Sequence, residues 1–90
     1  LAIESAGLFA SRLEREVGAD RRAQLRRGWL LALGRQASEN ELDAAEAFLD
    51  RQMAALKTRQ PEGDDAARSH RVLATLCQAL LSANGFLYVD

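Results

Sequence analysis

Apolar residues recur at helical spacing along most of the chain, and this pattern constrains the fold more than any other feature. The most regular stripe lies in the last third of the sequence. It consists of Val72, Leu73, Leu76, Leu80 and Ala83. Because an α-helix completes one turn in about 3.6 residues, positions at this spacing share one face. The stripe therefore predicts an amphipathic helix, starting after Asp64 or Asp65 and ending near Ala83.

Three earlier segments have the same periodicity. They are expected to form helices at about residues 2–17, 21–33 and 39–58. Their ends have signals of their own: Asp20 is a good N-cap, and Gly18 and Gly34 are good helix stops. Ser38 and Glu41 have the spacing of a capping box at the start of the third helix. The sequence thus predicts four helices.

The segment RQPEGDD separates the last two helices, and its proline and glycine mark it as a loop. We expect it to be the most mobile part of the chain. The 90 residues are 48% hydrophobic and 28% charged, with one proline, an ordinary globular composition. Residues 1–90 are therefore expected to form a single all-α domain, a compact four-helix bundle or an orthogonal helical array.

The C-terminal segment SANGFLYVD departs from the amphipathic pattern. Gly85 is expected to end the last helix, because glycine adopts the left-handed conformation found at helix C-termini. An extended apolar tail would then follow, made of Phe86, Leu87, Tyr88 and Val89. Two interpretations of this tail are open. Phe86, with Leu87 or Tyr88, packs onto the open end of the bundle, or the tail is an interface with a partner.

The net charge is −1, so no overall attraction to nucleic acid or to anionic lipid is expected. No apolar run approaches the roughly 20 residues of a membrane span. The lone Cys77 cannot form an internal disulfide and leaves the compartment open. With 48% apolar residues, an exposed patch and self-association are both conceivable for so small a domain.

An arginine cluster in the second predicted helix is the strongest hint of nucleic-acid binding. It comprises Arg21, Arg22, Arg26 and Arg27. Together with the following turn and helix it resembles a helix-turn-helix, in which arginines contact phosphates and bases. The helix in the recognition position is acidic, however, with Glu39, Glu41, Asp43 and Glu46 in its first turns. These side chains would repel phosphates, so a solvated arginine face is the expected role, and Trp29 is expected in the core.

Residues suited to catalysis are present but scattered. His70 has no second histidine with which to share a metal, and Cys77 falls at the edge of the last apolar stripe, where it is expected to be buried. Glu41 and Glu46 could serve a glycan-processing site only if set across a cleft. The sequence predicts no catalytic, cofactor-binding or metal residue and no cofactor in this chain.

Two stretches resemble a known family. LRRGWLLALGRQASENELDAAEAFL, residues 25–49, is similar to the pattern "aw-lalgR-Pt-eEl-a-FL", and LATLCQALLSANGFLYVD, residues 73–90, to "w-LCqaLlNsNeFlYvd". Both occur near the C-terminus of large planctomycete proteins that carry domain-of-unknown-function family 1553. LAIESAGLFASRL, residues 1–13, resembles the preceding helix of that family. The sequence departs from these patterns at Ala37, Ser82 and Gly85.

The resemblance implies the C-terminal part of a larger, exported or periplasmic protein, and a chain that begins with Leu1 fits a fragment or a processed product. Family members often also carry a planctomycete-type cytochrome c domain, and a link to polysaccharide breakdown is implied by domain context. The first expectation is a non-catalytic helical module that packs against neighbouring domains. The alternatives are a part of a glycan-processing enzyme and a nucleic-acid binder.

Overall fold

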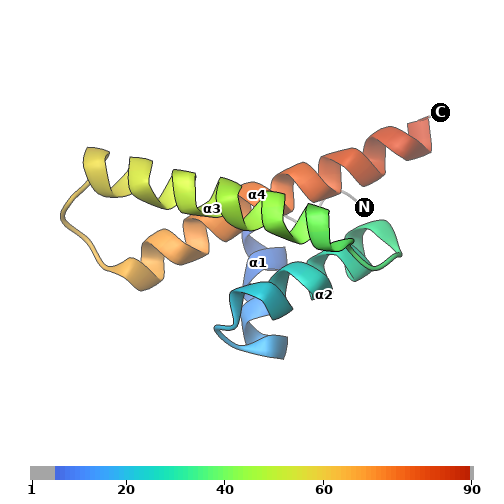
Figure 1. The fold of residues 1–90 in the computed structure, drawn as a ribbon, viewed down its shortest axis with the longest axis horizontal. Helices are drawn as coiled ribbons and strands as arrows, with labels where there is room; N and C mark the ends of the chain where they lie inside the picture. The colour runs from blue at the N-terminus through green and yellow to red at the C-terminus, as the bar shows by residue number, and fades with distance from the viewer. Residues whose placement is uncertain (1–5, 90) are drawn as a thin grey trace.

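The computed structural model describes the backbone of residues 6–89 and the side chains of residues 6–82. This range contains only helices: α1 (Ala6–Val17), α2 (Arg21–Leu33), α3 (Glu39–Arg59) and α4 (Asp65–Val89) (Figure 1). The predicted all-α fold is confirmed. The predicted bounds of the second helix match, and those of the third differ by one residue at the C-terminal end. Residues 2–5 of the first predicted helix lie outside the described part of the chain.

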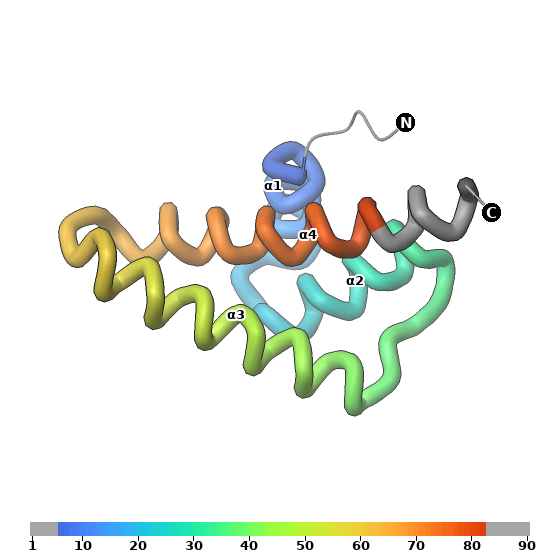
Figure 2. The backbone as a smooth tube through the Cα atoms, turned by 90° about the horizontal axis from the view of Figure 1, so that it is seen from above, coloured from blue at the N-terminus to red at the C-terminus, as the bar shows by residue number. Residues whose placement is uncertain are grey.

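The helices do not all share one direction: two run side by side and α1 crosses them (Figure 1). α3 and α4 run in opposite directions as a long hairpin, and α1 crosses α4 on the side away from α3 (Figures 1 and 2). α2 packs against all three other helices, as does α4, whereas α1 and α3 make no contact within the described residues. The hairpin lies along the 42 Å long axis of the molecule (Figure 1).

The core lies where α1, α2 and α4 meet and continues along the α3–α4 hairpin. The predicted stripe of α4 supplies Val72, Leu73, Leu76 and Leu80, all buried as expected, and Cys77 is buried among them. Leu13 of α1 and Leu25 of α2 face this stripe in the same apolar cluster. Burying a side chain of this size contributes about 1.5–3 kcal/mol, so this contact region is a major source of stability.

Gly28 allows α2 to approach its neighbours closely. A Cβ atom at this position would lie 3.3 Å from Leu13 Cδ1 and 3.4 Å from Leu80 Cδ1. Trp29 follows and is buried in the core as predicted, although its indole Nε1 has no hydrogen-bond partner among the described residues. A buried donor of this kind costs about 1–3 kcal/mol, so apolar packing of the ring must outweigh that cost.

The predicted caps form at the helix ends. The Asp20 side chain accepts from the backbone N–H groups of Arg22 and Ala23, and Gly34 ends α2 with a φ of 72°. Ser38 and Glu41 form the reciprocal capping box of α3, in which the Ser38 N–H donates to Glu41 Oε1. These local signals fix where α2 ends and α3 begins, and hence the turn between them.

Arg68 binds the loop between α3 and α4 to the start of α4. Arg68 is largely buried, and its Nη2 donates to the carbonyl oxygens of Gln60 and Pro61, each at 2.9 Å. Its Nη1 donates to Asp65 Oδ1 at 2.7 Å. The sequence did not predict these bonds, and the mobility of the loop stays a prediction.

The predicted end of the last helix at Gly85 is wrong. The backbone of α4 continues as a helix to Val89, so the apolar tail is not extended. A glycine inside a helix costs only about 1 kcal/mol relative to alanine, and the leucines and alanines around it favour the helical state. The side chains of Phe86, Leu87, Tyr88 and Val89 lie outside the described residues, so their packing stays a prediction.

Candidate functional site

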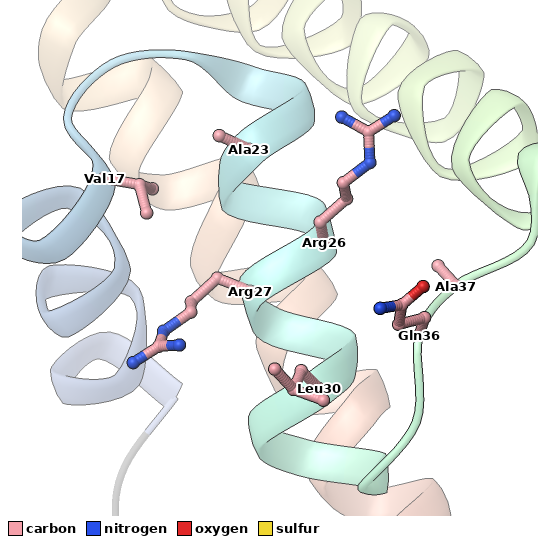
Figure 3. Close-up of a pocket in the computed structure, with 7 residues that line it drawn as sticks. All are labelled: Val17, Ala23, Arg26, Arg27, Leu30, Gln36 and Ala37. Atoms are coloured by element: carbon pink, nitrogen blue, oxygen red, sulfur yellow. The ribbon is translucent and has the colours of Figure 1, made fainter.

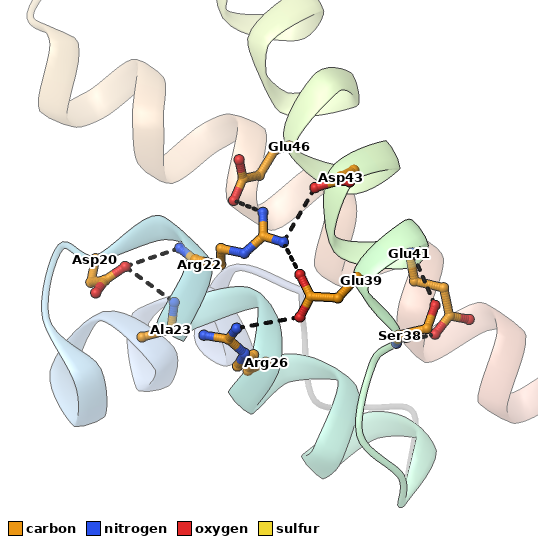
Figure 4. Close-up of polar contacts among 9 residues, drawn as sticks. All are labelled: Asp20, Arg22, Ala23, Arg26, Ser38, Glu39, Glu41, Asp43 and Glu46. Atoms are coloured by element: carbon orange, nitrogen blue, oxygen red, sulfur yellow. Dashed lines mark hydrogen bonds and ion pairs between the residues drawn. The ribbon is translucent and has the colours of Figure 1, made fainter.

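The arginine cluster of α2 faces the acidic start of α3. Arg22 Nη2 donates to Glu39 Oε1 at 2.7 Å and to Asp43 Oδ1 at 3.2 Å, and Arg22 Nη1 donates to Glu46 Oε2 at 2.9 Å (Figure 4). The hydrogen bonds that Arg22 donates to Glu46 and then to Glu39 raise the pKa of Arg22 above its ordinary value. Arg22 therefore joins α2 to α3 through three carboxylates at once.

The other three arginines have different surroundings. Arg21 donates to Gln24 of its own helix and to Ser69 of α4, and burial lowers the pKa of Arg21. Arg27 Nε donates to Glu16 Oε1 of α1 at 2.9 Å. Arg26 is the most exposed of the four, and its ion pair is long, 3.7 Å from Nη2 to Glu39 Oε2. The cluster thus contributes to three helix contacts, and Arg26 is the member least engaged in them.

This arrangement bears on the nucleic-acid hypothesis. Glu39 and Asp43, which would face phosphates if α3 were a recognition helix, are largely exposed beside Arg22. A phosphate backbone approaching the arginines would meet both carboxylates, and that repulsion opposes binding. The geometry is better suited to holding two helices together than to contacting a duplex.

The two carboxylates considered for glycan chemistry are held in ion pairs. Arg35 Nη1 and Nη2 donate to the two oxygens of Glu41 at 2.9 and 2.8 Å. Arg35, with the Ser38 backbone N–H, lowers the pKa of Glu41 from its ordinary value of 4.5 to about 2. A general acid in a glycosidase needs a raised pKa, so Glu41 is poorly suited to that role. The carboxylate of Glu46 is paired with Arg22 at 2.9 Å.

His70 meets a carboxylate across the α1–α4 contact. Its Nδ1 lies 3.0 Å from Glu14 Oε1, at the edge of a shallow pocket of about 630 Å³ that Ser69 and Asp64 also line. Adjacent residues on a helix point in different directions, and Ser69 bonds to Arg21 rather than to His70. The contact is therefore a bond between α1 and α4.

Cys77 is fully buried, and burial raises the pKa of its thiol to about 12. A thiol in this state is a poor nucleophile and a poor metal ligand. Within the part of the chain whose side chains are described, no group of three or more His, Cys, Asp or Glu residues is placed to hold a metal ion.

A groove opens on the outer side of α2, between the end of α1 and the turn that leads to α3 (Figure 3). It has a volume of about 500 Å³. Its apolar wall consists of Val17, Ala23, Leu30 and Ala37. Leu30 is 43% exposed, and within residues 6–82 the only large hydrophobic side chain that is more exposed is Leu8 of α1, at 61%. The side chains of Arg26 and Arg27 extend from α2 in opposite directions and form the rim of the groove (Figure 3).

Sequence reasoning missed this groove. The predicted stripe of α2 took in Leu25, Trp29, Ala32 and Leu33, and these positions do face inward or lie at the edge of the core. The available signal was Leu30 itself. It lies next to Trp29 and outside the stripe, so a single buried face could not accommodate it.

None of the helices in residues 6–89 is both long enough and apolar enough to cross a membrane. Comparisons with protein-family models, with curated proteins and with solved structures found no match for this chain.

Proposed function

We propose that this domain is a non-catalytic helical module that docks against a neighbouring domain of a larger protein, as the resemblance to the C-terminal region of family 1553 proteins implies. That resemblance also makes an exported or periplasmic protein part of the proposal. The observation that carries the docking function is the groove beside Leu30, with its apolar wall open to solvent.

The use of the charged side chains supports this proposal. Arg22, Arg35 and Arg68 are engaged in bonds that hold helices, caps and the α3–α4 loop in place. Within the wall of the groove, Ala37 packs against the core, whereas Leu30 has no comparable role in the fold because it lies on the face of α2 that is turned away from the core. A concave apolar surface with a polar rim is a common form of protein interface.

A thiol-labelling experiment tests the docking function. Leu30→Cys is introduced both into the 90-residue chain and into the full-length protein, and the rate of modification by a small maleimide is measured. In the isolated chain the rate is expected to be that of an exposed thiol. In the full-length protein we expect it to fall severalfold, because a docked domain covers the groove. The natural Cys77 adds little background, since it is buried.

Ala55→Cys is the matched control, because Ala55 is exposed on α3 and does not line the groove. Its labelling rate should be the same in both proteins. Equal rates at Leu30→Cys in both proteins would remove the proposed function.

A further inference from the structure

We propose that the occupant of the groove is an acidic segment of a partner domain that places one apolar side chain against Leu30 and carboxylates against Arg26 and Arg27. This inference rests on the docking function proposed above and adds the chemistry of the partner. Three features of the groove lead to it: its apolar wall, the two arginines at its rim and the incomplete use of their charges.

The apolar wall comes from three consecutive parts of the chain. Val17 ends α1, Ala23 and Leu30 lie on α2, and Ala37 belongs to the turn before α3. A volume of about 500 Å³ has room for a leucine or phenylalanine side chain and its flanking backbone. An apolar side chain placed there would remove Leu30 from water, which is the main source of affinity at such a site.

The two arginines have donors to spare. Arg27 uses Nε for Glu16 and, among the described residues, leaves its two Nη groups unengaged. Arg26, within residues 6–82, has only the 3.7 Å contact with Glu39, whose other oxygen is 2.7 Å from Arg22. Guanidinium groups with available N–H donors favour carboxylates, which they can bind in a bidentate manner.

The carboxylates near the rim decide between a peptide and a nucleic acid. Glu16 and Glu39 flank the arginines, and Asp43 lies one helical turn beyond Glu39. A phosphate backbone carries charge along its whole length and would come close to all three acids. A short peptide can place one or two carboxylates on the arginines and its apolar side chain in the groove, so the charge pattern favours a peptide.

A peptide titration tests the inference. The probe is a short capped peptide in which a leucine is flanked on both sides by glutamates, added to the ¹⁵N-labelled 90-residue chain. Matched peptides carry lysines in place of the glutamates, or alanine in place of the leucine. We expect saturable amide shifts around Leu30 and Ala37 with the glutamate peptide, and at least about tenfold weaker binding of both matched peptides.

Variants of the protein locate the site. Arg26→Gln combined with Arg27→Gln should weaken binding about threefold to tenfold, the range expected for two exposed ion pairs. Arg51→Gln removes an exposed arginine of α3 that does not line the groove, and it should leave the affinity unchanged. Circular dichroism melting of each variant shows whether the fold is retained.

Two results would overturn the inference: binding of the lysine peptide as tight as that of the glutamate peptide, or tighter binding of a short DNA duplex. The thiol-labelling experiment separates this failure from failure of the docking function. If the groove is covered in the full-length protein but rejects the acidic peptide, docking stands and the acidic partner is wrong. If the groove is not covered, the docking function itself fails.

Discussion

The two sides of α2 differ in composition and in surroundings: the inner side packs in the core, and the outer side carries charged and exposed residues. On the inner side, Leu25 and Trp29 are buried, and Gly28 brings the helix against Leu13 and Leu80. On the outer side, Arg22 reaches three carboxylates of α3, and Arg26 and Leu30 face solvent. One helix thus contributes both to the core and to the groove.

The difference shows which side chains of α2 hold the core together and which are left open to solvent. Each apolar contact on the inner side stabilises the fold, since removing those atoms would leave a cavity. The outer side is tied down by ion pairs, which orient helices but contribute little when exposed. An apolar residue left on that outer side, such as Leu30, adds nothing comparable to stability in the isolated chain.

The largest expected effect comes from truncating a buried leucine. Leu25→Ala should lower the free energy of unfolding by about 2–5 kcal/mol, because the residue is 1% exposed and its loss leaves a cavity. Leu30→Ala on the outer side of the same helix should cost less than about 1 kcal/mol. Urea unfolding of the two variants compares them directly, and similar losses would contradict the division between the two sides.

The close approach at Gly28 gives the next effect. Gly28→Val should cost about 1–3 kcal/mol, because its Cβ would already lie 3.3 Å from Leu13 Cδ1 before the two methyl groups are added. By helix propensity alone a change from glycine to valine inside a helix would be neutral or slightly stabilising, so a loss of stability reports the close contact. Thermal melting measures it, and an unchanged or higher melting temperature would mean that α2 can move away from its neighbours.

Removing Arg22 tests the ion pairs of the outer side. Arg22→Gln should lower the melting temperature, because it leaves Glu39, Asp43 and Glu46 close together without their common partner. The loss should be smaller than that of Leu25→Ala, because exposed ion pairs contribute little to stability. The loss should shrink as NaCl is raised, since salt screens the remaining repulsion. A loss that is independent of salt would show that Arg22 acts through packing of its methylene groups instead.

The smallest expected effect concerns the capping box of α3. The pKa of Glu41 is about 2 in the folded protein and ordinarily 4.5. Its ionised form therefore stabilises the fold above about pH 4.5, and this contribution is lost as the pH falls toward about 2. In Glu41→Gln the melting temperature should fall less steeply across that interval. An identical slope in both proteins would show that the cap contributes nothing measurable.

Local signals in the sequence predicted the helices and most of their ends. Asp20, Gly34 and the Ser38–Glu41 pair act within a few residues of themselves, so their roles follow from sequence spacing alone. Gly85 was misjudged because a glycine near the end of a helix is compatible with both a stop and a continuation, and only the surrounding residues decide between them.

The candidate site could not be predicted in the same way. The acids at the start of α3 were expected to oppose phosphate binding, but their convergence on Arg22 depends on how α2 and α3 cross. The groove is likewise assembled from the end of α1, one face of α2 and a turn. A sequence pattern gives the face of a helix on which a residue lies, whereas a groove requires the packing of several elements.

The central claim is that Leu30 and the groove beside it serve docking rather than folding, and Leu30→Gln tests it most directly. Glutamine has a helix propensity close to that of leucine, so the change removes the apolar surface and little else. The measurement is the unfolding free energy of this domain, by pulse proteolysis, in the isolated chain and in the full-length protein. We predict a change within about 0.5 kcal/mol in the isolated chain and a clearly larger loss in the full-length protein, where docking adds to stability. The same small change in both proteins would contradict the claim.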